Sequence, residues 1–156
     1  MSRVDRVPRW AWRLFRLPPQ LIYRLGFGKI YGRMVLLLST RGRRTGKLRT
    51  TPLQYERIDE DYYVAAARGM KTDWLRNIQS DPKVVVRVGE GQFHAMAEII
   101  QDQEMIADFL ALRLAKHPRF VGTIMRMDGY PSNPDRDDLI TYANNRVMVI
   151  LHPVQS

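Results

Sequence analysis

The residues of this chain that are best suited to bind a ligand form a basic turn between two apolar runs. Two glycines, several hydroxyl groups and five cationic side chains lie in it: Arg41, Arg43, Arg44, Lys47 and Arg49. Glycine allows the backbone angles of a tight turn. Successive turn amides can form an anion-binding concavity, and arginine binds phosphate or carboxylate groups in a bidentate way. We therefore expect a polyanionic ligand here, against the alternative of a solvated hairpin tip.

The composition limits the classes of function. The chain has 156 residues, a net charge of +9 and no cysteine. That charge implies attraction to nucleic acid, an anionic membrane face or a multiply charged small molecule, and the lack of cysteine excludes disulfides and thiolate chemistry. The three histidines are far apart, so we expect no metal site. We see no secretory signal or membrane-spanning run, and so expect a cytoplasmic protein.

Residues 1–33 are expected to form an N-terminal amphipathic helical segment. In the stretch from Val7 to Leu17, arginines recur every three or four residues on one face, and Trp10 and Leu14 lie on another. Such a helix either packs its apolar side on the rest of the protein or contacts an anionic membrane surface through residues 6–17. The second alternative would place the protein peripherally on the inner face of the cell membrane.

From residue 34 the hydrophobic period becomes that of strands. We expect six strands, at residues 34–40, 47–57, 62–68, 83–88, 92–100 and 147–151. A short helix should follow Thr72 as far as Ile78, and a longer one should run from Asp102 to Lys116, with residues 118–138 irregular. Mostly antiparallel strands with inserted helices favour a small closed or split barrel over a doubly wound sheet.

The basic turn resembles that of the deazaflavin-dependent nitroreductase and quinone reductase family, whose members bind coenzyme F420. Residues 64–69 (VAAARG), 73–78 (DWLRNI) and 81–84 (DPKV) also resemble the family, in the expected order. The resemblance covers residues 34–100. It implies a mainly β (α+β) fold, a six-stranded split β-barrel like that of FMN-binding proteins, with flanking helices and with residues 34–156 as the coenzyme-binding domain.

The resemblance also implies where the anionic end of the coenzyme binds. Coenzyme F420 carries a phosphodiester and a glutamate tail, which agrees with the positive charge of the chain. By the family pattern Arg43, Arg44 and Thr45 would hold the phosphate, with Gly46 in the same turn and Arg49 nearby.

The same resemblance places the tricyclic ring. The segment Thr51, Pro52 and Leu53 would run beneath the ring, and Ala67 would offer backbone groups to its edge. Trp74 and Asn77 would close over the coenzyme, although a tryptophan on a short helix is more often a packing residue.

Four further residues have roles implied by the family pattern. Lys71 could meet the glutamate tail, and Arg68 stands where the family commonly has a lysine, which keeps the charge but not the geometry. Some members place tyrosines from the C-terminal helical region over the ring, and the candidates here are Tyr130 and Tyr142.

The activity implied is hydride transfer from reduced F420 to a small conjugated acceptor: a quinone, an enone or a nitro compound. The coenzyme would perform the redox chemistry while the protein supplies position and electrostatics, so no catalytic side chain is assigned. The alternatives are an FMN-binding split-barrel protein and a non-catalytic carrier of haem or lipid on the same barrel. Nucleic-acid binding is not expected, because no nucleic-acid motif accompanies the arginines. A homodimer is possible.

Overall fold

The computed structural model describes residues 35–66, 69–144 and 146–154. The described residues form two compact units: a barrel unit of residues 35–100 and 147–154, and a helical unit of residues 101–146. The helical segment expected within residues 1–33 lies outside the described residues. No helix in the described ranges is long and apolar enough to cross a membrane.

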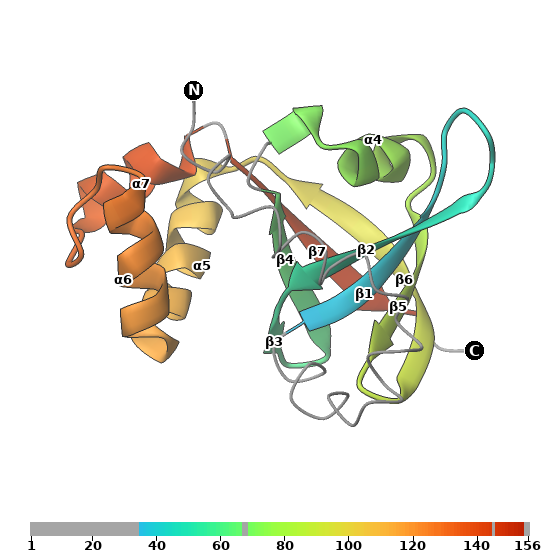
Figure 1. Ribbon diagram of the computed structural model, residues 1–156, viewed down its shortest axis with the longest axis horizontal. Helices are drawn as coiled ribbons and strands as arrows, with labels where there is room; N and C mark the ends of the chain where they lie inside the picture. Colours follow the sequence, from blue (N-terminus) through green and yellow to red (C-terminus); the bar gives the residue numbers. More distant parts are fainter. Residues whose placement is uncertain (1–34, 67–68, 145, 155–156) are drawn as a thin grey trace. The chain divides into compact units, whose positions relative to one another are not determined.

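The barrel unit is one antiparallel sheet that curls on itself (Figure 1). Its strands follow the order β2-β1-β5-β6-β7-β4-β3, and every neighbouring pair is antiparallel. The strands are β1 (Val35–Arg41), β2 (Leu48–Gln54), β3 (Glu56–Ile58), β4 (Asp61–Ala66), β5 (Lys83–Val88), β6 (Gly91–Ile100) and β7 (Val147–Pro153). The predicted mainly β split-barrel class is confirmed.

The structure has seven described strands where the sequence predicts six, because the predicted strand at residues 47–57 is broken at Tyr55. Its first part, β2, pairs with β1 at one edge of the sheet, and its second part, β3, pairs with β4 at the other edge. The break thus carries the chain from one edge to the other. This crossing is possible only because the sheet is strongly curled, as a split barrel requires.

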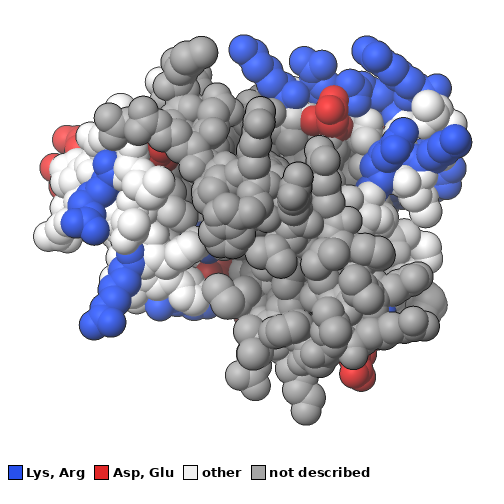
Figure 2. Space-filling view, in the orientation of Figure 1, with Lys and Arg blue, Asp and Glu red and all other residues white. Residues whose placement is uncertain are grey.

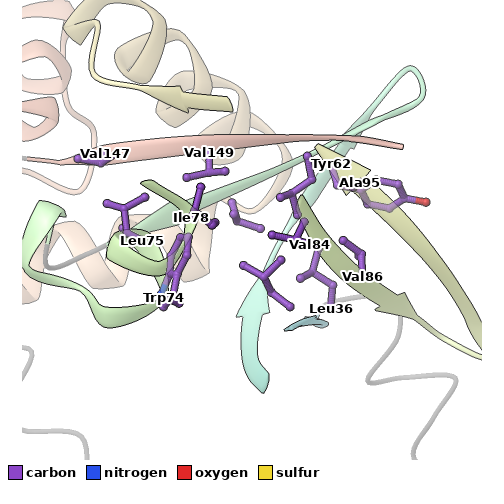
Figure 3. Close-up of a cluster of buried hydrophobic side chains, with 14 residues drawn as sticks. Leu36, Tyr62, Trp74, Leu75, Ile78, Val84, Val86, Ala95, Val147 and Val149 are labelled. Atoms are coloured by element: carbon purple, nitrogen blue, oxygen red, sulfur yellow. The ribbon is translucent and has the colours of Figure 1, made fainter. Parts of the chain in front are cut away.

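The core of this unit lies on the concave side of the sheet and is closed by helix α4 (Asp73–Ser80). Leu36 and Leu38 alternate inward on β1 and are fully buried, as expected for a strand with one buried face. From α4, Trp74, Leu75 and Ile78 meet side chains of β5 and β7 (Figure 3). The packing of these residues fixes which face of α4 points at the sheet.

Helix α4 begins after Thr72, as the sequence predicts, and extends two residues beyond Ile78. Thr72 has the extended backbone of an N-cap residue (φ −71°, ψ 130°), but its side chain makes no capping hydrogen bond. The position of the helix start is therefore confirmed, while the hydroxyl cap that motivated it is absent.

The helical unit contains α5 (Gln103–Lys116), α6 (Pro118–Met127) and α7 (Arg136–Ala143). Helix α5 starts as predicted, because Asp102 Oδ1 accepts a hydrogen bond from the Met105 amide at 3.0 Å. The prediction that residues 118–138 are irregular is wrong for the helical residues 118–127 and 136–138, and holds for residues 128–135. Pro118 occupies a first-turn position, where its missing N–H is not needed.

Helix α7 begins with a capping box that the sequence already contains. Asp135 accepts from the Asp138 amide at 2.8 Å, and the Asp138 side chain accepts from the Asp135 amide at 3.1 Å. The spacing of these two aspartates, followed by buried Leu139 and Tyr142, is the signal that would have predicted this helix.

Tyr142 is part of a buried polar contact inside the helical unit. Its hydroxyl donates to Asp128 Oδ2 at 2.7 Å, and the Arg146 guanidinium carbon lies 3.5 Å from its ring centroid. Burial, helped by the bond to Asp128, raises the pKa of Tyr142 to about 12. Tyr130 packs edge-on against the same ring, with centroids 5.0 Å apart. The Tyr142 hydroxyl therefore makes a structural hydrogen bond.

His152 connects three strands on one face of the sheet. On β7 its Nδ1 lies 3.0 Å from Asp61 Oδ1 of β4, and its Nε2 lies 2.7 Å from Glu98 Oε2 of β6. The bond to Glu98 raises the pKa of His152 above its usual value; partial burial opposes this, and Asp61 adds to the increase. The protonated imidazole is thus favoured in the folded protein.

We expect H152Q to reduce stability more at pH 6 than at pH 9. A raised folded-state pKa gives stabilisation that is complete below the unfolded value of about 6.5 and disappears as the pH rises through the folded value. Because His152 is partly exposed, the loss at pH 6 should be about 1 kcal/mol or less. Urea unfolding at the two pH values measures this loss of stability. An equal loss at both pH values would contradict a raised pKa of His152.

Candidate functional site

The β1–β2 turn has the tight geometry that its glycines suggest. The Gly42 amide donates to the Lys47 carbonyl at 2.8 Å, and the Gly46 amide donates to the Gly42 carbonyl at 2.8 Å. Gly46 has a φ of +71°, which glycine adopts without strain. A Cβ on Gly42 would lie 3.1 Å from both the Lys47 carbonyl oxygen and Thr45 Oγ1. The positive φ favours glycine at residue 46, and the close contacts favour glycine at residue 42.

The turn and helix α4 together border a cleft of about 420 Å³, within the size range of small-molecule sites. Figure 2 shows basic side chains gathered over this end of the barrel unit. The lining residues that the structure describes are Gly42, Arg43, Arg44, Thr45, Arg49, Thr51, Asp73, Trp74 and Asn77. We call this the arginine cleft.

Arg43 is held in place by a buried polar residue of α4. Asn77 Oδ1 accepts from the Arg43 backbone amide at 3.3 Å and from Arg43 Nη1 at 3.0 Å. On its other side, Asn77 Nδ2 donates to Thr40 Oγ1 at 3.1 Å. Thr40 is fully buried and Asn77 is 4% exposed. The amide of Asn77 therefore joins the end of β1, the turn and α4 in one hydrogen-bonded bridge.

The charges of the arginine cleft are unbalanced. Asp73 Oδ1 lies 3.3 Å from Arg43 Nη2, whereas no acidic side chain among the described residues pairs with Arg44 or Arg49. Three arginines thus face one aspartate. A concave site with excess positive charge of this kind concentrates anions, and its guanidinium groups suit phosphate and carboxylate.

The structure gathers most of the residues proposed for the site from sequence. Seven of them line the arginine cleft: Arg43, Arg44, Thr45, Arg49, Thr51, Trp74 and Asn77. Gly46 lies in the turn beside it. Trp74 is also a core residue, 7% exposed, which confirms its packing role. Its contact with the coenzyme stays a prediction.

The other proposed residues are not brought to the cleft in the described part of the chain. Pro52 and Leu53 continue along β2, where Leu53 packs against the core. Lys71 is exposed at the end of the short 3-10 helix η2 (Gly69–Lys71). Ala67 and Arg68 lie outside the described residues.

Sequence reasoning missed Asp73 and Thr40. Asp73 and Asn77 are four residues apart, a spacing that puts both on one face of a helix, so the contact of both with Arg43 was available as a hypothesis. Thr40 gave no such signal, because only the folded structure brings it to Asn77.

Comparisons with known proteins identify the family of this chain. The family model of the F420H(2)-dependent quinone reductases matches residues 24–128. An F420H(2)-dependent quinone reductase of Mycobacterium tuberculosis is 32% identical over 111 residues, covering 63% of this chain and 74% of that protein.

Two solved structures share the fold. An F420-H2-dependent reductase, FDR-A, superposes with a TM-score of 0.51 at 19% identity, over 76% of this chain and 94% of its own. The haem storage protein HutZ of Vibrio cholerae superposes with a TM-score of 0.54 at 16% identity, over 82% and 88% respectively. At these identities the likeness concerns the fold alone.

The chain belongs to the F420H(2)-dependent quinone reductase family. It is an oxidoreductase, and coenzyme F420 is its redox partner. The resemblance drawn from the basic turn and the three downstream segments is thereby confirmed.

We expect N77A to destabilise the protein by about 1–3 kcal/mol, the cost of leaving buried hydrogen-bonding groups without partners. The groups affected are Thr40 Oγ1 and the Arg43 amide. Urea unfolding measures the loss. The matched control is Q79A, two residues further along the exposed side of α4. Equal stability of the two variants would contradict the bridge.

Proposed function

We propose that this protein transfers a hydride from reduced coenzyme F420 to a quinone, and that the arginine cleft binds the anionic tail of the coenzyme. The observation that carries the proposal is the convergence of Arg43, Arg44 and Arg49 on one cleft, with no acidic partner among the described residues for the last two. Family membership indicates the redox chemistry, and this cleft offers a binding site for the negatively charged tail of the coenzyme.

The donors of the cleft fit a phosphodiester and carboxylates. Arg43 presents a guanidinium whose position is set by Asn77, so little freedom remains to be lost when an anion binds. Thr45 Oγ1 accepts from the Lys47 amide at 3.3 Å, which leaves the Thr45 hydroxyl proton free to donate. Thr51 adds a second hydroxyl from β2. When bound, the coenzyme supplies the hydride.

The protein's contribution is positioning. An anionic tail anchored at the turn would run its ring along β2 towards Pro52 and Leu53, with Trp74 beside it. We also propose that the coenzyme contacts Ala67, Arg68 and Lys71, which follow β4 in the chain and precede α4. The acceptor would then be a flat conjugated quinone. Enones and nitro compounds of similar shape should be tested as acceptors in the same assay.

FMN is the second candidate coenzyme, because guanidinium and hydroxyl donors also suit a terminal phosphate. A visible absorbance spectrum of the protein titrated with each coenzyme separates the two. Membrane contact through residues 6–17 and homodimerisation stay predictions.

We expect R44A to lose affinity for coenzyme F420 by at least about tenfold, since a charge-assisted hydrogen bond contributes about 1.5–3 kcal/mol. Arg44 makes no hydrogen bond or ion pair with the described residues, so the melting temperature should change little. Fluorescence titration of the coenzyme measures the affinity.

The matched control is R57A, which removes the same charge on β3, outside the arginine cleft. If R44A and R57A bind the coenzyme equally well, the cleft is not the binding site of the anionic tail.

A further inference from the structure

Asp73 is the acidic side chain that lines the arginine cleft in the described part of the chain. Its carboxylate lies 3.3 Å from Arg43 Nη2, while Arg43 Nη1 is bound to Asn77. Both terminal nitrogens of this guanidinium thus have a partner within the protein. An anion that binds Arg43 must either displace the carboxylate or bind close beside it.

Stability does not explain the Asp73–Arg43 contact. The Asp73 side chain is 87% exposed and the Arg43 side chain 25%, and ion pairs with such an exposed member contribute little to folding. Asp73 opens α4, and the next two residues, Trp74 and Leu75, are anchored in the core, so the backbone of Asp73 is fixed at the edge of the cleft. The exposed side chain can rotate, but its negative charge stays within a side-chain length of this edge.

A fixed negative charge affects ligands in proportion to their own charge. By Coulomb's law, a group with two negative charges is repelled about twice as strongly as a group with one in the same place. A phosphodiester carries one charge, whereas a phosphate monoester carries about 1.5 to 2 charges at pH 7. The arginines alone would favour the monoester for the same reason.

We propose that Asp73 is a specificity-determining residue, which shifts the preference of the arginine cleft from phosphate monoesters towards phosphodiesters. This inference rests on the proposed function and concerns the phosphate group alone, since the glutamate carboxylates of coenzyme F420 add further negative charge to its tail. Asp73 offsets part of the positive charge that would otherwise draw the more highly charged phosphate.

The test compares wild-type protein with D73N at pH 8, where monoesters are fully ionised. Three probes are titrated: coenzyme F420, FMN, and the cyclic phosphodiester of riboflavin, in which the phosphate of FMN forms a second ester bond to the ribityl chain. We expect D73N to bind FMN about tenfold more tightly and the cyclic diester about threefold more tightly, the ratio that doubled repulsion requires, and to bind coenzyme F420 at least as tightly as the wild-type protein does. Raising the salt concentration should shrink both gains.

Two further variants serve as controls. D73E keeps the charge and should keep the wild-type preference. D81N removes a carboxylate beside another arginine, Arg41, at the far end of α4, and should leave all three affinities unchanged. Melting temperatures within a few degrees of wild type show that D73N and D81N are folded.

Lower affinity of D73N for coenzyme F420 would overturn the inference, since Asp73 would then bind the coenzyme directly. Equal gains for diester and monoester, or no gain, would overturn it as well. If wild-type protein binds no F420, the proposed function fails. The two riboflavin phosphates still test the selection by charge in that case.

Discussion

The candidate site depends on the hydrogen-bonded bridge that Asn77 makes between Thr40 and Arg43. One buried amide satisfies a hydroxyl at the end of β1, the backbone of the basic turn and a guanidinium group. Removing the Asn77 amide deprives the buried Thr40 hydroxyl and the Arg43 backbone amide of this hydrogen-bond partner, which is costly. The turn is consequently fixed against α4, and a cationic loop that would otherwise be free in solvent becomes one wall of a cleft.

The fold supplies the two parts of that bridge from separate sources. The β1–β2 hairpin brings the turn, and α4 is fixed by Trp74, Leu75 and Ile78 against the inner face of the sheet. The same helix carries a buried face for the core (Figure 3). At Asp73 and Asn77 it also carries polar groups for the cleft. The packing of the core thus sets the geometry of the arginine cleft. The exposed carboxylate of Asp73, at the start of the helix, lowers the net positive charge of this cleft.

Local patterns predicted the parts of this structure that local interactions create. Alternating apolar residues gave the strands, Asp102 gave the start of α5, and paired glycines gave the turn. Two expectations failed. The segment that begins at Pro118 was expected to be irregular, although proline suits a first helical turn. The break at Tyr55 follows from closure of the sheet, which depends on contacts between distant strands and not on the local sequence. Seven cleft residues were named in advance, but the bridge through Thr40 is a tertiary contact.

The central claim is that the arginine cleft binds coenzyme F420 through its anionic tail. Titration of the wild-type protein with F420 at low and high ionic strength tests it most directly. We predict saturable binding that weakens steeply as salt increases, because charged groups in a partly exposed cleft are screened. Absence of saturable binding, or an affinity that does not change with salt, would contradict the claim.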